Sequence, residues 1–189
     1  MLNHMVERGK VLWEVAMTLD GFISGPGDSM DWMSEVRTTS KPVVEPAVAN
    51  LGAVVVGRRT WGEGSRKPGG ELYGGAWAGP IFVLTHRVPQ PGDPLYDDPV
   101  TFLDVPIAEA VATALDAAGG KDVNLIGANL ATQAVDAGLV DEVLLHVVPL
   151  FLGGGTRLFE RPGGIVHLDW VEQSDAGGFA NLRLRPRAA

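Results

Sequence analysis

Two carboxylates near the start of the chain are the first candidates for acid–base chemistry. Asp20 follows an apolar run, and Asp31 stands beside Trp32. An aromatic neighbour disfavours the ionised form of a carboxylate, so Asp31 could donate a proton near neutral pH. Both residues also suit structural roles, since Asp20 before Gly21 is typical of a turn and Asp31 of a helix cap. We expect Asp31 or Asp20 to supply the catalytic carboxylate.

Two segments combine a buried strand, a glycine and the start of a helix. One spans residues 54–60 and includes Gly57, and the other spans residues 123–130 and includes Gly127. A helix N-terminus offers unpaired N–H groups and a partial positive charge, and glycine lets an anion approach the backbone. Together the two junctions could hold the pyrophosphate of a dinucleotide. Each alone is also typical of a simple turn, and neither matches G-x-G-x-x-G or a Walker A loop.

Basic residues are clustered on an acidic chain. The formal net charge is −8, yet Arg58 and Arg59 are adjacent, and Thr85, His86 and Arg87 close an apolar run. Arginine binds phosphate oxygens in a bidentate manner, so residues 85–87 could meet a ribose 2′-phosphate. Ordinary solvated side chains are the alternative interpretation. The negative charge argues against nucleic acid as a partner, because it repels the phosphate backbone.

Several classes of chemistry lack the residues they need. There is no cysteine, which removes disulfides, thiolate nucleophiles and Cys-ligated zinc, and the four histidines have no metal-ligand spacing. No serine nucleophile elbow is present. The first ten residues lack the apolar core of a signal peptide, and no apolar run is long enough to cross a bilayer. We therefore expect a cytoplasmic protein with no metal and no membrane partner.

The apolar pattern predicts one α/β domain over residues 1–189, with residues 1–10 as a tail. Helices are predicted over residues 41–50, 107–118 and 128–137, and residues 62–79 form a long glycine-rich loop. Alternating strands and helices followed by a hairpin indicate a mostly parallel sheet, an antiparallel C-terminal pair and helices on both faces. The predicted strands are residues 11–16, 53–56, 81–84, 100–103, 123–126, 140–148, 165–174 and 179–184.

Six motifs in a fixed order resemble one family. They are Ala16–Ile23, Val56–Trp61, Phe82–Arg87, Gly127–Leu130, Gly138–Glu142 and Pro149–Phe159. This order resembles the C-terminal reductase domain of the bifunctional riboflavin-biosynthesis deaminase/reductase. It is most similar to the stand-alone, dihydrofolate-reductase-like members, over about residues 11–184.

The resemblance implies a dihydrofolate-reductase-like fold that binds NADPH, often as a homodimer. It places the cofactor contacts at Gly57, Arg58, Arg59, Thr60, Thr85, His86, Arg87, Ile126, Gly127, Ala128, Asn129 and Leu130. It places the substrate side of the cleft at Met17, Asp20, Gly21, Asp31 and Trp32.

Two features depart from the family pattern. Ile126 precedes Gly127 where members usually carry paired glycines, and its Cβ could crowd the cofactor. With no cysteine, the chain has no zinc deaminase domain, so a role in riboflavin synthesis is not implied. We expect an NADPH-dependent reductase of a small pterin- or pyrimidine-like heterocycle. The alternatives are a dimeric binding module that has lost hydride transfer, and a flavin or deazaflavin in place of NADPH.

Overall fold

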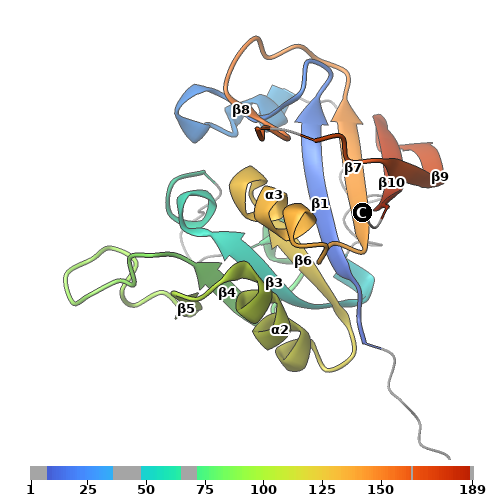
Figure 1. Ribbon diagram of the computed structural model, residues 1–189. Helices are drawn as coiled ribbons and strands as arrows, with labels where there is room; N and C mark the ends of the chain where they lie inside the picture. Colours follow the sequence, from blue (N-terminus) through green and yellow to red (C-terminus); the bar gives the residue numbers. More distant parts are fainter. Residues whose placement is uncertain (1–7, 36–47, 65–71, 163, 188–189) are drawn as a thin grey trace, which may run out of the picture.

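An eight-stranded sheet forms the centre of the protein in the computed structural model, which describes residues 8–35, 48–64, 72–162 and 164–187 (Figure 1). Its strands are β1 (Val11–Thr18), β3 (Leu51–Gly57), β4 (Ile81–Leu84), β5 (Thr101–Leu103), β6 (Asp122–Ile126), β7 (Glu142–Val148), β9 (Leu168–Ala176) and β10 (Phe179–Pro186). The order across the sheet is β5-β4-β3-β6-β1-β7-β10-β9.

The first six strands in this order run parallel, β10 is antiparallel to β7, and β9 is antiparallel to β10. The inner strands are continuous apolar runs because both of their faces are covered, as in Val54–Val56 of β3. Gly177 and Gly178 join β9 to β10, and both have the positive φ that a two-residue hairpin loop requires. The predicted parallel sheet with an antiparallel C-terminal hairpin is confirmed.

Two α-helices, α2 (Ile107–Ala118) and α3 (Ala128–Asp136), cover the same face of the sheet (Figure 1). Ala110, Val111 and Ala114 of α2 are buried against the apolar side chains of β1, β3 and β6. Gly119 ends α2 in the left-handed conformation, with a φ of 59°. The helices follow the boundaries that the sequence predicts to within about two residues.

Short helical turns cover the opposite face. They are η3 (Thr60–Gly64) and η4 (Tyr73–Gly75), and Trp61 and Leu72 pack there against Val54 and Val83. Within the described ranges, the α-helices therefore lie on one face of the sheet, and only single helical turns cover the other face. The helix predicted over residues 41–50 falls outside the described residues except at 48–50, as does part of the predicted loop at 62–79.

A small second sheet joins β2 (Phe22–Ser24) to β8 (Thr156–Arg157). Between β2 and β3 lie two 3-10 turns, η1 (Pro26–Asp28) and η2 (Asp31–Glu35). The chain at Gly155 passes so close to β2 that a Cβ there would lie 1.9 Å from the carbonyl oxygen of Ser24. Glycine is therefore required at this crossing.

Residues 8–10, which the sequence places in a tail, contact the folded domain. Nζ of Lys10 lies 2.9 Å from Oε1 of the buried Glu142, and Arg8 forms an ion pair of the same length with Asp141. Residues 1–7 lie outside the described residues. Neither α2 nor α3 nor any other helix in the described ranges has the length and apolarity that a bilayer crossing demands.

Candidate functional site

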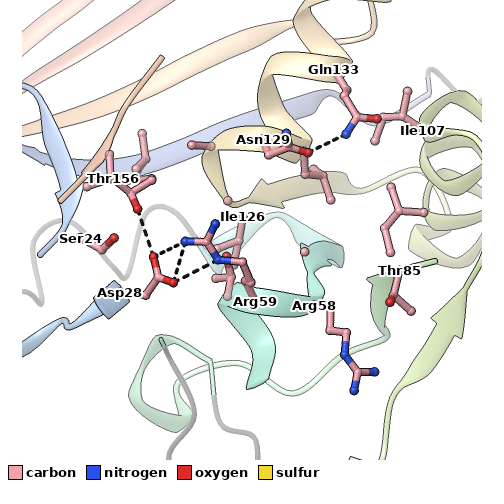
Figure 2. Close-up of a pocket in the computed structure, with 18 of the residues that line it drawn as sticks. Ser24, Asp28, Arg58, Arg59, Thr85, Ile107, Ile126, Asn129, Gln133 and Thr156 are labelled. Carbon is pink, nitrogen blue, oxygen red and sulfur yellow. Dashed lines mark hydrogen bonds and ion pairs between the residues drawn. The ribbon is translucent and has the colours of Figure 1, made fainter. Parts of the chain in front are cut away.

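A cleft of about 720 Å³ lies where β3, β4, β5 and β6 end (Figure 2). In open α/β sheets, ligands bind beyond the carboxyl ends of the strands. The predicted cofactor residues that line the cleft are Gly57, Arg58, Arg59, Thr60, Thr85, His86, Ile126, Gly127, Ala128, Asn129 and Leu130. The sheet thus brings together three segments that are distant in sequence.

The two strand-to-helix junctions lie side by side. β3 and β6 are neighbours, and Val56 pairs with Ile126 at their ends. Gly127 has a φ of 118°, and a Cβ at this position would lie 2.9 Å from Oγ1 of Thr60. Such a φ disfavours any other residue, and the close approach leaves no room for a side chain. A single ligand can therefore touch both junctions.

The N-terminus of α3 offers its first turn to the cleft. Gly127 is the N-cap residue, and no side chain caps the turn. The first N–H groups of a helix have no intrahelical partner and carry a partial positive charge. At Gly57 a Cβ would meet no atom within 4 Å, so the backbone there borders open space. These features fit a ligand that carries a pyrophosphate.

Ile126 packs on the face of the sheet opposite α3. Its side chain contacts the apolar cluster that contains Val56 and Trp61, and the residue is half-buried. Ile126 also belongs to the cleft lining, so its side chain forms part of the cleft wall on the face of the sheet opposite α3.

Arg59 is held by a carboxylate within the cleft. Its Nη2 lies 2.6 Å from Oδ1 of Asp28 and its Nε lies 3.0 Å from Oδ2 (Figure 2). Oγ1 of Thr156 also donates to Asp28, at 3.0 Å. The hydrogen bond from Arg59 lowers the pKa of Asp28, so the pair is charged at neutral pH.

Arg58 points away from Arg59 (Figure 2). Its guanidinium donates to the carbonyl oxygen of Arg87 at 2.8 Å and forms an ion pair with Asp93 at 2.8 Å. The N–H of Leu95 and then Arg58 lower the pKa of Asp93. Both arginines of the predicted phosphate site are thus paired with a carboxylate in this structure.

The third predicted segment lies at the far end of the cleft. Thr85 is buried, and its Oγ1 accepts a hydrogen bond of 3.0 Å from the backbone N–H of Arg87. His86 is exposed, and its Nδ1 lies 3.0 Å from Oδ1 of Asp104. The cleft lining contains Thr85 and His86 but does not include Arg87.

Asp20 is not suited to the catalytic role predicted for it. Its carboxylate accepts hydrogen bonds from the hydroxyl of Thr18 and from the backbone N–H groups of Leu152 and Gly153. The hydroxyl of Thr18 and then the two N–H groups lower its pKa to about 2. A carboxylate this acidic holds no proton at neutral pH, and it fixes the loop after β7 instead.

Asp31 also lies apart from the cleft lining. It is exposed at the start of η2, and its Oδ2 accepts a hydrogen bond from the hydroxyl of Ser29 at 2.9 Å. Trp32 is buried against Val148 and Phe179, and it does not enclose the exposed carboxylate. The structure therefore does not place Trp32 as the predicted aromatic wall around the Asp31 carboxylate.

The remaining substrate-side predictions also fall outside the cleft lining. Met17 is half-buried in β1, where it pairs with Val147. The carbonyl of Gly21 accepts a hydrogen bond from the N–H of Leu158. Trp32 belongs to the apolar cluster described above.

The cleft also contains polar residues that were not predicted as site residues: Glu14, Ser24, Asp28, Asp104 and Thr156. Asp28 and Thr156 reach it only through the pairing of β2 with β8, which no sequence pattern indicates. Glu14 could have been noticed in the sequence, because it is the one charged residue in the apolar run at 11–16. Within the described ranges, no three His, Asp or Glu side chains are grouped as a metal ion would require.

Known proteins are similar to this chain in sequence and in fold. The RibD C-terminal domain family matches residues 9–177. YyaP of Bacillus subtilis (strain 168), an uncharacterized protein, is 28% identical over 174 residues, which are 84% of this chain and 84% of YyaP. A solved structure of a proposed riboflavin biosynthesis protein from Shewanella sp. PV-4 matches with a TM-score of 0.71 and 18% identity. The match covers 95% of this chain and 99% of that chain.

A second structure is that of a diaminohydroxyphosphoribosylaminopyrimidine deaminase/5-amino-6-(5-phosphoribosylamino)uracil reductase from Thermotoga maritima. It matches with a TM-score of 0.64 and 16% identity, over 95% of this chain and 57% of that chain. These two structural matches confirm the predicted fold.

Proposed function

The chain belongs to the RibD C-terminal domain family, and from this premise we propose that it is an NADPH-dependent reductase of a small heterocycle. The observation that supports this function most directly is the meeting of Gly57, Thr60 and Gly127 at one cleft. Dinucleotide cofactors bind at such junctions because backbone N–H groups and the helix dipole favour the pyrophosphate.

Different residues at the cleft would contact different parts of the cofactor. Gly57 and Thr60 on one side and the first turn of α3 on the other would hold the pyrophosphate. Arg59 would exchange Asp28 for a cofactor phosphate, and Thr85 and His86 would lie toward the ribose 2′-phosphate. Bound NADPH would supply a hydride to a C=N or C=O carbon of the substrate. The protein would mainly orient the two reactants and exclude water.

The substrate we propose is a planar pyrimidine- or pterin-like ring. The part of the cleft beyond α3 is bordered by Ala16, Ile23 and Met30, and these apolar side chains suit the face of such a ring. The names of the similar proteins from Shewanella and Thermotoga maritima, which refer to riboflavin biosynthesis and to a uracil reductase, support this class of substrate.

A non-catalytic binding module is the second candidate. It is favoured by the positions of Asp20 and Asp31, which leave the reaction without the proton donor that the sequence predicts. Such a module would bind a nucleotide in the same cleft and leave it unchanged.

Ligand-dependent melting tests the cofactor assignment. At 100 times its dissociation constant, NADPH should stabilise the protein by about 2.7 kcal/mol. NADH, FMN and a deazaflavin serve as comparisons, and no shift with millimolar NADPH would overturn the proposal. Loss of reduced-nicotinamide absorbance over a panel of pterins, pyrimidines and quinones then separates the two candidates. Binding without oxidation by any panel member favours the module.

We also propose that the protein acts as a homodimer. β9 is one of the two edge strands of the described sheet, and all of its residues except the last are exposed. They include Leu168 (41% exposed), Trp170 (65%) and Val171 (43%). β9 also carries Asp169, Glu172 and Asp175. An edge strand with exposed apolar side chains is a template for pairing with another chain, and a two-fold axis lets each copy cover the other.

A further inference from the structure

A buried carboxylate and a histidine meet at the floor of the cleft. Glu14 of β1 borders the cleft, and its Oε1 lies 3.1 Å from Nε2 of His146 on the neighbouring strand β7. The two side chains are 11% and 14% exposed. Two ionisable side chains this well buried need partners for their remaining polar atoms.

The amide of Asn181 fixes the protonation of His146 on its far side. Nδ2 of Asn181 donates to the carbonyl oxygens of Ala176 and Phe179, at 3.1 Å and 3.2 Å. Carbonyl oxygens only accept, so the amide nitrogen must face them and Oδ1 must face the imidazole. Oδ1 lies 2.7 Å from Nδ1 of His146. Nδ1 therefore carries a hydrogen, and it cannot be the nitrogen that gains or loses one.

The contact between Glu14 and His146 consequently holds one exchangeable proton. With Nδ1 protonated, Nε2 either donates to a Glu14 carboxylate or accepts from a Glu14 carboxylic acid. Burial alone lowers the pKa of His146, but the hydrogen bonds with Glu14 and Asn181 outweigh it and raise the pKa above its ordinary value. The pair therefore keeps its proton to a higher pH than an isolated imidazole does.

A strained tyrosine orients the other oxygen of Glu14. Oε2 lies 3.4 Å from both the hydroxyl of Tyr73 and Nδ2 of Asn124, and Asn124 also accepts from the backbone N–H of Glu14. Tyr73 has a φ of 54°, which a bulky side chain rarely adopts. Backbone strain of this kind persists where the surroundings hold a residue in place, and it gathers at functional sites.

We propose that Glu14 is the proton donor of the reductase and that His146 is the positioning residue that reloads it. This inference rests on the proposed function. As hydride reaches the carbon of a substrate C=N bond, the π electron pair moves to the nitrogen. That nitrogen takes the proton of the pair, which leaves a Glu14 carboxylate and a neutral His146. Solvent then returns one proton, so one hydride and one proton are consumed in each turnover.

Few other ionisable groups in the described structure face this pair. Tyr73 approaches from η4, while β6 and β10 present the neutral amides of Asn124 and Asn181. Glu142 and Arg183 lie further along the same face of the sheet and already bind each other. Among the described residues, the protonation of His146 is therefore governed mainly by its contacts with Glu14 and Asn181.

The first test needs neither cofactor nor substrate. The histidine resonances of the ligand-free protein are titrated by NMR, and His146→Gln identifies the signal of His146. The pKa of His146 should lie above about 6.5 in the wild type and fall below that value in Glu14→Gln, where burial acts without a carboxylate. An unchanged pKa in Glu14→Gln would overturn the inference.

The second test is a single-turnover reduction with NADPH and whichever ring compound the panel identifies. Glu14→Gln should slow the hydride step by about 10²–10⁴-fold, and Glu14→Asp should restore part of it. The NADPH-dependent rise in melting temperature should survive in both variants, which also proves that they fold. Glu109→Gln, the same change on the exposed side of α2, is the control and should retain the wild-type rate.

The outcomes separate this inference from the proposed function. If NADPH leaves the melting temperature of the wild type unchanged, both the proposed function and the assignment of Glu14 are overturned. A wild type that binds and oxidises NADPH, with Glu14→Gln equally fast, overturns the assignment of Glu14 alone.

Discussion

Arg59 and Asp28 form a two-pronged ion pair that joins the end of β3 to the small sheet of β2 and β8. The arginine that suits a cofactor phosphate is therefore engaged by a carboxylate of its own chain. Because the Arg59 side chain is 70% exposed, the pair adds only about 0–1 kcal/mol to stability. An incoming phosphate can replace Asp28 at little cost.

Changing the two members of this pair should have opposite effects on cofactor binding. Arg59→Gln removes a phosphate ligand and should raise the NADPH dissociation constant about tenfold, equivalent to about 1.4 kcal/mol. Asp28→Asn releases Arg59 and should lower the dissociation constant several-fold. Fluorescence titration with NADPH measures both. Equal weakening by the two variants would mean that the pair serves the fold rather than the ligand.

Gly127 should tolerate no side chain. In Gly127→Ala the residue is strained by its φ of 118°, and its Cβ meets Oγ1 of Thr60. We expect a lower melting temperature and loss of the NADPH-dependent shift. Gly138→Ala is the matched control, because Gly138 also has a positive φ but its Cβ would meet nothing within 4 Å. It should cost about 1–2 kcal/mol and leave the NADPH shift intact.

Gly57 separates binding from folding more cleanly. No atom lies within 4 Å of the position of its Cβ, and its φ is not positive, so Gly57→Ala should melt no lower than the wild type. The added methyl group would nevertheless occupy the space that we assign to the cofactor. Calorimetric titration should show weaker NADPH binding in this variant. Unaltered affinity would place the pyrophosphate elsewhere.

The stabilisation from Asp20 should disappear in acid. Its pKa of about 2 lies below the 3.8 of an unperturbed carboxyl, so its contribution is complete above about pH 4 and is lost as the pH falls toward 2. Asp20→Asn should melt below the wild type at neutral pH, and the gap should close across this window. Asp97→Asn, at an exposed loop position, should melt like the wild type throughout. A gap that persists at about pH 2 would contradict the assignment.

Trp170 should control the oligomeric state. Trp170→Glu replaces the most exposed apolar side chain of β9 with a charge and should turn a dimer into a monomer, because an unpaired charge in an interface is costly. Sedimentation velocity measures the change. Gln173→Glu on the same strand adds equal charge without removing apolar surface, and it should leave most of the protein dimeric. A monomeric wild type would contradict the homodimer.

Sequence reasoning succeeded where structure is local. β4 has the predicted boundaries Ile81–Leu84 because a continuous apolar run fits only a strand covered on both faces. The end of α2 at Gly119 follows from the left-handed conformation that glycine adopts readily. The two glycine junctions were recognisable for the same reason, since the requirement for glycine is imposed by the backbone itself.

Sequence reasoning failed where a side chain meets a distant partner. Asp20 has the neighbours of a turn residue, but its hydrogen bonds to Leu152 and Gly153 cross more than 130 positions of sequence. β2 and β8 have three and two residues, too few for any periodicity to emerge. His146 alternates with apolar neighbours and is typical of a packed core residue, so its contact with Glu14 becomes visible only when β1 and β7 are paired.

The place of β1 in the sheet has a consequence for how the protein is made. β1 is the first strand of the chain, yet it lies between β6 and β7, and Glu14 and its partner Asn124 are 110 residues apart. At roughly 5–20 residues per second, a ribosome needs about 5–20 s to deliver that partner. During this interval the apolar strand lacks its neighbours in the sheet, and exposed strands of this kind favour aggregation of the nascent chain.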